Sequence, residues 1–151
     1  MTNLRTEAWL LRGISSIPGT LSLQSRLVMF TAHGAGSAWP WQLRKLERAM
    51  RAEGLATSIE AGEASVVFRW PVSDARFWIP WYYFGGGLIL EHDGQRLRFS
   101  FGRPANTHVP VKDLANVVSN IREVTHMRAT GRAWLSALSR ARVDMGRAGR
   151  V

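Results

Sequence analysis

Residues 93–101 of the chain read DGQRLRFSF, and this stretch decides the fold class. Directly after the turn dipeptide Asp-Gly, the apolar residues Leu97, Phe99 and Phe101 alternate with polar ones. An alternation with a period of two is typical of a strand that has one face in water and the other in the core. Residues 18–24, PGTLSLQ, repeat the pattern after a Pro-Gly turn. The sequence therefore predicts a domain rich in antiparallel strands.

Each of these stretches belongs to a predicted hairpin. A strand over residues 88–91 precedes the Asp-Gly turn and a strand over 95–101 follows it, and Asp-Gly between two such runs is a strong hairpin signal. The strand over residues 20–24 is followed almost at once by a second apolar run over 26–32. We therefore expect a tight hairpin around Ser25.

Two more strands are predicted between the hairpins, over residues 65–70 and 76–84. Val66, Phe68 and Trp70 alternate with other residues and are expected to share one face. The run of three glycines that follows the second strand predicts a bulge or tight bend. A phosphate-binding loop would need a helix after the glycines, and here a strand follows.

An amphipathic helix is predicted over residues 39–54, because apolar residues recur near helical spacing and Gly54 suits a helix end. The apolar residues of this helix are Trp41, Leu43, Leu46 and Met50. Residues 4–12 are expected to form a short helix that a preceding polar residue caps.

A longer helix is predicted after a linker over residues 104–110, and Pro110 suits its first turn. Its apolar stripe consists of Leu114, Val117, Val118, Ile121 and Val124. Gly131 is expected to interrupt the helix, and residues 145–151 are expected to be frayed.

The composition limits the classes of protein and of site. Apolar residues make up 46% of the 151 residues and charged residues 21%, as in a soluble single domain. The absence of cysteine excludes disulfides, thiolate catalysis and cysteine-based zinc sites. The four histidines lack the spacing of metal ligands. The first residues lack the pattern of a signal peptide, so a cytoplasmic location is expected, with a peripheral place at the membrane as the alternative.

The net charge is +9, and 18 of the 20 basic residues are arginines. This balance favours anionic partners, meaning a membrane surface, a nucleic acid or an acidic protein. The helix over residues 39–54 combines a basic face with Trp39 and Trp41, as does a helix that lies on an anionic membrane. Residues 122–150 hold seven arginines against Glu123 and Asp144, which suggests an arm that contacts phosphates. For both segments the alternative is an ordinary solvated surface.

The candidate contacts with an anionic ligand or a membrane are basic residues and tryptophans. They lie in these two segments and in the first hairpin turn. They are Arg26, Trp39, Trp41, Arg44, Lys45, Arg48, Arg51, Arg128, Arg132, Arg140 and Arg142.

Three segments resemble parts of the pleckstrin-homology-like (PH-like) domains of GRAM type and of their bacterial relatives. Residues 19–30, GTLSLQSRLVMF, resemble the opening hairpin of that family. Residues 70–75, WPVSDA, are similar to its I-P-L-x-D-I turn, and residues 87–99, GLILEHDGQRLRF, to its late hairpin. The resemblance covers residues 14–128 and leaves an Arg-rich helical extension over 129–151.

The resemblance implies one domain over residues 1–151, with a small β-barrel or sandwich of about seven antiparallel strands and a C-terminal capping helix. The helix near residues 40–53 is an addition to that plan. Members of the family target membranes or bind proteins and seldom act as enzymes, so neither catalysis nor a cofactor is expected. Phosphoinositide-binding members carry several Lys and Arg residues in the loop between the first two strands. This chain offers only Arg26 there.

The leading hypothesis is therefore a non-enzymatic binding module for an anionic membrane surface or a protein partner. A nucleic-acid-binding protein that uses the same basic residues is the first alternative. A hydrolase or ligand-binding enzyme with a pocket in the barrel is the second. The aromatic residues of the segment 77–84 that lie outside the core would suit a partner or a homodimer.

Overall fold

The computed structural model describes residues 3–80, 86–104 and 114–148, and for residues 114–121, 123–124 and 144–148 it describes the backbone alone. The strands in this part of the chain are β1 (Leu4–Arg12), β2 (Ser15–Gln24), β3 (Leu27–Ala32), β4 (Ser65–Pro71), β5 (Arg76–Trp78), β6 (Gly87–His92) and β7 (Gln95–Ser100). The helices are α1 (Pro40–Met50), α2 (Leu55–Glu60), the short 3₁₀ turn η1 (Val72–Asp74) and α3 (Leu114–Ala148).

The strands form one antiparallel sheet in the order β4-β3-β2-β1-β7-β6-β5. Both predicted hairpins are present, with Leu21 opposite Phe30 in the first and Leu90 opposite Leu97 in the second. The two halves of the sheet are joined where β1 pairs with β7, at Leu10 opposite Phe99. One strand, β1, therefore belongs to both halves.

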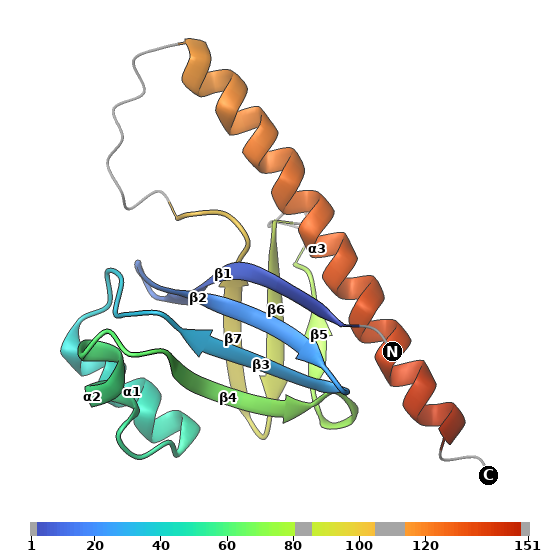
Figure 1. Cartoon of the computed structure of the whole chain (residues 1–151), viewed down its shortest axis with the longest axis horizontal. Coiled ribbons are helices and arrows are strands. Elements are labelled where there is room, and N and C mark those ends of the chain that lie inside the picture. Colours follow the sequence, from blue (N-terminus) through green and yellow to red (C-terminus); the bar gives the residue numbers. More distant parts are fainter. Residues whose placement is uncertain (1–2, 81–85, 105–113, 149–151) are drawn as a thin grey trace.

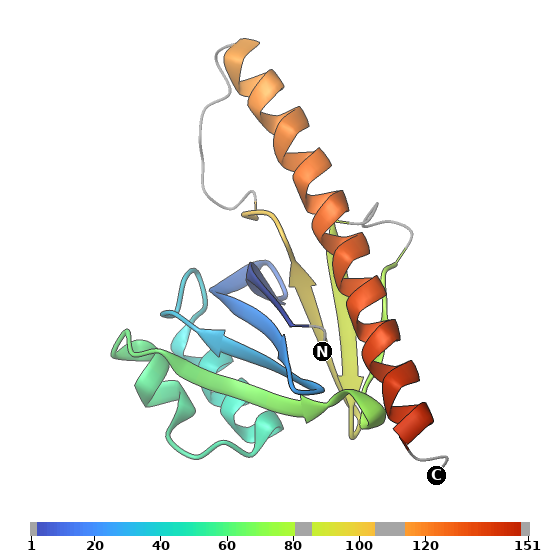
Figure 2. The same cartoon turned by 45° about the vertical axis from the view of Figure 1, so that its right-hand side comes forward.

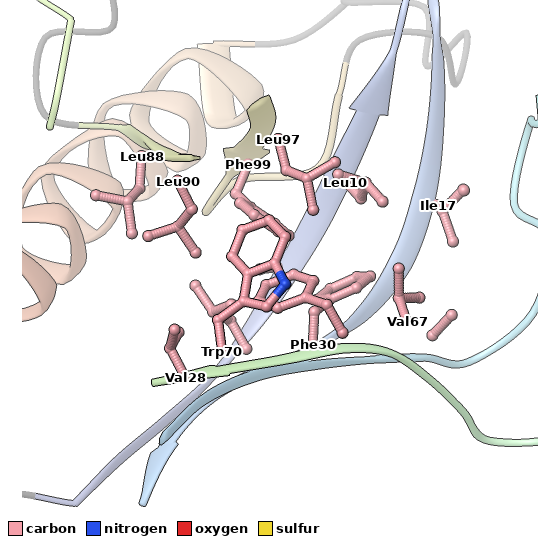
Figure 3. Close-up of a cluster of buried hydrophobic side chains, with 14 of the residues drawn as sticks. Leu10, Ile17, Val28, Phe30, Val67, Trp70, Leu88, Leu90, Leu97 and Phe99 are labelled. Carbon is pink, nitrogen blue, oxygen red and sulfur yellow. The ribbon is translucent and has the colours of Figure 1, made fainter. Parts of the chain in front are cut away.

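The sheet bends over itself, so that its two halves enclose a common core (Figures 1 and 2). The ring centroid of Phe99 on β7 lies 5.1 Å from that of Phe30 on β3 and 6.0 Å from that of Phe68 on β4. Figure 3 shows side chains of both halves, among them Leu10 and Leu90, pointing into this cluster. The predicted fold class is confirmed: seven antiparallel strands in the described part of the chain, capped by a C-terminal helix, with an added amphipathic helix.

The helix predicted over residues 4–12 is wrong, because this segment is the strand β1. Ala8 and Leu10 are buried, whereas Glu7 is exposed and Trp9 only half-buried, which is the alternation of a strand. Three consecutive apolar residues from Trp9 hid this alternation. Pairing with β2 along its whole length and with β7 near its end stabilises the extended form.

The prediction for the face of Val66 is also wrong, since its side chain is 45% exposed. The pairing of β3 and β4 shifts at a β-bulge, where Phe30 lies opposite Phe68 but the next residue, Thr31, lies opposite Val66. Val67 is the extra residue of the bulge and is buried together with Phe68. A bulge reverses the face of every residue beyond it, and a simple alternation cannot reveal that reversal.

The helices differ from the prediction at their ends. The α1 helix is present, but it ends at Met50, and its C-cap residue Arg51 is in the left-handed region (φ 52°). Gly54 instead precedes α2, a helix that the sequence pattern did not predict. The α3 helix continues through Gly131 without interruption and reaches Ala148, so residues 145–148 are helical rather than frayed.

Several predicted features fall outside the described residues. They are most of the linker over 104–110, Pro110, the aromatic residues 81–84, the first of the three glycines and residues 149–151.

The α3 helix runs along one side of the sheet, and its N-terminal part extends beyond the strands (Figures 1 and 2). Trp134 anchors it: the side chain is fully buried, and its Nε1 donates a hydrogen bond of 2.7 Å to Oγ1 of Thr6 on β1. The indole lies nearly parallel to Phe101, with centroids 6.4 Å apart. About one and two turns further on, Leu138 and Ala141 continue the buried face.

We expect Trp134→Ala to lower the free energy of unfolding by about 3–5 kcal/mol, because it leaves a large cavity and an unpaired Thr6 hydroxyl. Urea denaturation followed by circular dichroism measures this loss. Leu135→Ala, on the exposed side of the same helix, is the matched control and should cost within about 0.5 kcal/mol. Equal effects of the two variants would contradict the anchoring role of Trp134.

The bulge in β4 allows a second stability comparison. Val67→Thr places a hydroxyl in the core and should cost about 1–3 kcal/mol. Val66→Thr changes a side chain exposed to solvent and should stay within about 0.5 kcal/mol. Chemical denaturation of both variants tests the assignment, and a larger loss for Val66→Thr would show that the faces of β4 are reversed.

Candidate functional site

The structure places the predicted contact residues on two opposite sides of the sheet. One group lies at α1, below and to the left in Figure 1, and the other lies along α3 on the far side of the strands. The first group comprises Trp39, Trp41, Arg44, Lys45, Arg48 and Arg51, all exposed. The second group comprises Arg128, Arg132, Arg140 and Arg142. The eleven residues therefore do not form one surface.

Arg26 and Arg142 both contact η1. Arg26 lies in the turn between β2 and β3. The backbone oxygen of Arg26 accepts a hydrogen bond of 3.0 Å from the amide of Val72 in η1. The guanidinium of Arg142 donates to the backbone oxygens of Val72 and Ala75 and lies 4.6 Å from the ring centroid of Phe77. These contacts hold α3 to the turn between β4 and β5, so the Arg142 side chain is engaged in packing.

A cleft of about 440 Å³ lies between α1 and the outer face of β1 and β7. We call it the basic cleft, because four of its lining residues are cations. It is lined by Leu11, Arg12, Gly13, Trp41, Gln42, Lys45, Arg96 and Arg98. Trp41 and Lys45 belong to the predicted contacts, whereas the three arginines do not.

The pairing of β1 with β7 positions the sheet side of the basic cleft. Leu11 of β1 lies opposite Arg98 of β7, so the end of β1 adjoins the arginines of β7. Arg96 and Arg98 are exposed because they alternate with the buried residues Leu97 and Phe99. The same alternation that builds the core therefore directs two guanidinium groups to the outer face.

Gln42 positions the helix side of the cleft. Its Nε2 donates a hydrogen bond of 3.1 Å to the backbone oxygen of Arg12, and its Oε1 accepts one of 2.8 Å from the amide of Trp39. The side chain is buried, so the first bond joins α1 to the end of β1 in a place with little water, and the second caps the start of α1 at Trp39. This contact brings Trp41 and Lys45 next to the arginines.

The basic cleft has more cations than carboxylates. In the described residues the ion pairs join Glu91 to Arg76 (3.4 Å) and to Arg96 (3.0 Å). Arg12, Lys45 and Arg98 therefore lack a carboxylate partner in this part of the chain. Burial lowers the pKa of Arg12 below its ordinary value, because its guanidinium is partly withdrawn from water.

Both arginines that form ion pairs with Glu91 also lie over the ring of Trp78. The guanidinium of Arg96 lies 5.1 Å from the Trp78 ring centroid, and that of Arg76 lies 5.8 Å from it. Cation–π contact and the ion pair with Glu91 together restrict Arg96 to one wall of the cleft. Arg98 has neither contact with Trp78 nor an ion pair in the described residues, so its charge is less compensated.

Exposed apolar side chains stand at the edge of the basic cleft. Ile14, next to the lining residue Gly13, is 85% exposed at the tip of the β1–β2 turn. Trp41 is 57% exposed and lines the cleft, and Trp39, two residues earlier, is 63% exposed. Large apolar side chains next to a set of cations are typical of a surface that enters the headgroup region of a membrane.

The sequence pattern identified the helix side of this site and missed the strand side. Arg96 and Arg98 were visible as the wet face of a strand, but nothing in the pattern places that face beside α1. Arg12 was hidden within a segment predicted to be helical. Knowledge that β1 pairs with β7 would have been needed to join them.

The described residues show little else that suggests chemistry. No group of three metal-ligating side chains is found among them. The Oγ1 of Thr20 and the Nε2 of His33 are 2.8 Å apart on an exposed sheet face. Among the described helices, none has the length and hydropathy needed to span a membrane.

Comparison of the chain with protein-family models gives no match. Comparison with curated proteins and with solved structures likewise gives none.

The buried Gln42 provides a test of how the site is built. Gln42→Ala leaves the backbone oxygen of Arg12 and the amide of Trp39 without these partners, and we expect a loss of about 1–3 kcal/mol in unfolding free energy. Gln24→Ala, at an exposed strand end, is the control and should stay within about 0.5 kcal/mol. Chemical denaturation measures both, and a neutral Gln42→Ala would show that α1 is held by other contacts.

Proposed function

We propose that this chain is a non-enzymatic binding module, related to the PH-like domains, that docks on an anionic membrane surface through the basic cleft. The observation that carries the proposal is the position of exposed Ile14, Trp39 and Trp41 at the edge of a cleft in which three of the four cations have no carboxylate partner among the described residues. The docked protein is peripheral, with the cleft toward the lipid headgroups and α3 on the side away from them.

The two kinds of side chain have complementary parts in docking. Tryptophan favours the boundary between headgroups and acyl chains, because its ring is apolar and its N–H finds a polar partner there. Arg12, Lys45 and Arg98 are attracted by the negative surface potential of an anionic leaflet, which adds about 1 kcal/mol for each basic residue near the surface. Neither term suffices alone for stable binding, and here they occur at the same end of the molecule.

The relation to PH-like domains is supported by the order of elements. A meander of four strands, three further strands and a C-terminal helix that covers the bent sheet match what the resemblance implies. The added α1 helix lies in the connection between β3 and β4. In this proposal that connection is the part that supplies the membrane-facing tryptophans.

Co-sedimentation of the intact chain with vesicles tests this function. Binding to phosphatidylglycerol-containing vesicles should exceed binding to pure phosphatidylcholine vesicles and should weaken as salt rises. Trp41→Ala should weaken it about tenfold, since the loss of a partly inserted ring costs on the order of 1.4 kcal/mol. Val143→Ser, which changes an equally exposed residue on α3, should have little effect.

Two outcomes would contradict the proposal. Equal binding to both kinds of vesicle, or to neither, would exclude an anionic membrane surface as the target. Tight binding to a single-stranded RNA that competes with vesicles would favour the nucleic-acid alternative. Substitutions are used in place of a deletion of α3, because that deletion would remove the buried Trp134.

A further inference from the structure

We infer that the part of α3 that extends beyond the sheet pairs antiparallel with the same part of a second copy of this chain. Self-association of this kind is independent of the proposed membrane function, because α3 lies on the side of the molecule away from α1 and the basic cleft (Figure 1). Its basis is an apolar stripe near the start of α3, which we call the α3 seam. The α3 seam consists of Leu114, Val117, Ile121 and Val124.

The C-terminal part of α3 is the part that packs on the sheet. In the described residues of this helix, the buried positions begin at Gly131; they are Gly131, Trp134, Ala137, Leu138 and Ala141. Met127 lies against Gly102, just after the end of β7. The helix before this point extends beyond the strands (Figures 1 and 2). The α3 seam therefore lies on a section of helix that has no described strand beneath it.

The α3 seam also lies on a different face of the helix from the residues that pack. An α-helix turns about 100° per residue, so the centres of the seam and of the buried positions are about a third of a turn apart. Leu135 follows Ile121 by two heptads and occupies nearly the same side of the helix. It is 36% exposed, although α3 runs along the sheet there. Closer packing of α3 on its own sheet would therefore not bury the seam.

The spacing of the α3 seam is that of a coiled coil and reads the same in both directions. Its residues are separated by three, four and three positions, like the a and d positions of two heptads. In an antiparallel pair with its two-fold axis near residue 119, Leu114 lies opposite Val124 of the second copy. Val117 then lies opposite Ile121 of the second copy. Each of the four layers of the pair therefore joins two apolar residues.

The charges near the α3 seam favour a second copy as the partner. The chain carries a net charge of +9, so most pairs of its surfaces would repel each other. The positions that flank the seam are uncharged; they are Val118, Asn120 and Thr125. Arg122 and Glu123 occupy the outer positions b and c, and their charges have opposite sign. Two copies can therefore approach along the seam with little repulsion.

The position of the next arginine selects the antiparallel arrangement. Arg128 follows Ile121 by one heptad, at the position where a third apolar layer would begin. Parallel pairing would set the two Arg128 side chains next to each other, and like charges in contact are unfavourable. Antiparallel pairing separates them by about 27 Å along the helix axis.

Antiparallel pairing also keeps the two sheets apart. The sheet of each copy lies toward the C-terminal end of its own α3, so the two sheets lie at opposite ends of the helix pair (Figures 1 and 2). Four apolar layers make a short contact, and association costs translational and rotational freedom. We therefore expect a weak dimer, with a Kd of about 10–100 µM.

Sedimentation velocity of the intact chain, from about 5 µM to about 500 µM, tests the association and should show conversion of monomer to dimer. Ile121→Glu places a carboxylate in the seam and should raise the Kd at least about tenfold. Ser119→Glu adds the same charge on the opposite side of the helix and should change the Kd by less than about threefold. Both positions precede the part of α3 that packs on the sheet, so thermal unfolding should be the same for all three proteins.

Introduced cysteines test the orientation, because the natural chain has none. A mixture of the Leu114→Cys and Val124→Cys variants should form a disulfide between unlike chains on mild oxidation. Either variant alone should cross-link poorly, because like positions lie about 15 Å apart along an antiparallel pair. Preferential cross-linking of like positions would overturn the antiparallel arrangement.

The remaining outcomes identify a different occupant or a different surface. A monomer at every concentration would overturn the second copy as the partner of the α3 seam. Equal loss of association in Ile121→Glu and Ser119→Glu would assign the contact to another surface. Binding to neutral phosphatidylcholine vesicles that only Ile121→Glu abolishes would make lipid the occupant of the seam.

Discussion

The pairing of β1 with β7 is the interaction on which the rest of the structure depends. It joins a four-strand meander to a three-strand meander, and it brings Leu10 and Phe99 into register at the centre of the core. Without it each half would expose its apolar face. The same short stretch of pairing sets Leu11 beside Arg98, so the closure of the core and the sheet side of the basic cleft have one cause. The stability of the core and the geometry of the basic cleft therefore both depend on β1.

Local pattern was sufficient for the elements that depend on neighbours in the sequence. The β6–β7 hairpin follows from alternation on both sides of an Asp-Gly turn, and α1 follows from apolar residues at helical spacing. Local pattern gave the wrong structure where contacts between residues distant in the sequence determine it. Segment 4–12 is a strand because two other strands pair with it, and Val66 faces outward because of a bulge against β3. The α3 helix continues through Gly131, which is buried and lies one turn before Trp134.

The residues of the candidate site also differ in whether local sequence pattern could identify them. Trp41 and Lys45 were predictable because a single amphipathic helix carries them, and their exposure follows from the buried positions of Leu43 and Leu46. Arg12 and Arg98 belong to strands far apart in the sequence, and only the pairing of β1 with β7 brings them to that helix together. Net charge indicated an anionic partner but not where it would bind. The distribution of the 18 arginines depends on the fold: Arg142 packs against backbone oxygens, and Arg98 remains unpaired in the described residues.

The α1–α2 segment has a consequence for how the surface of the basic cleft could change during evolution. It is a single connection between β3 and β4, and the strands on either side pair with each other directly. Substitutions in this segment therefore need not change the register of the sheet. This holds as long as Leu43 and Leu46 remain apolar and Gln42 keeps its hydrogen bond to β1. The strands supply a fixed half of the basic cleft, and the connection supplies an exchangeable half. Under the proposed membrane function, a new ligand preference could therefore arise from changes in this connection alone, while the sheet stays the same.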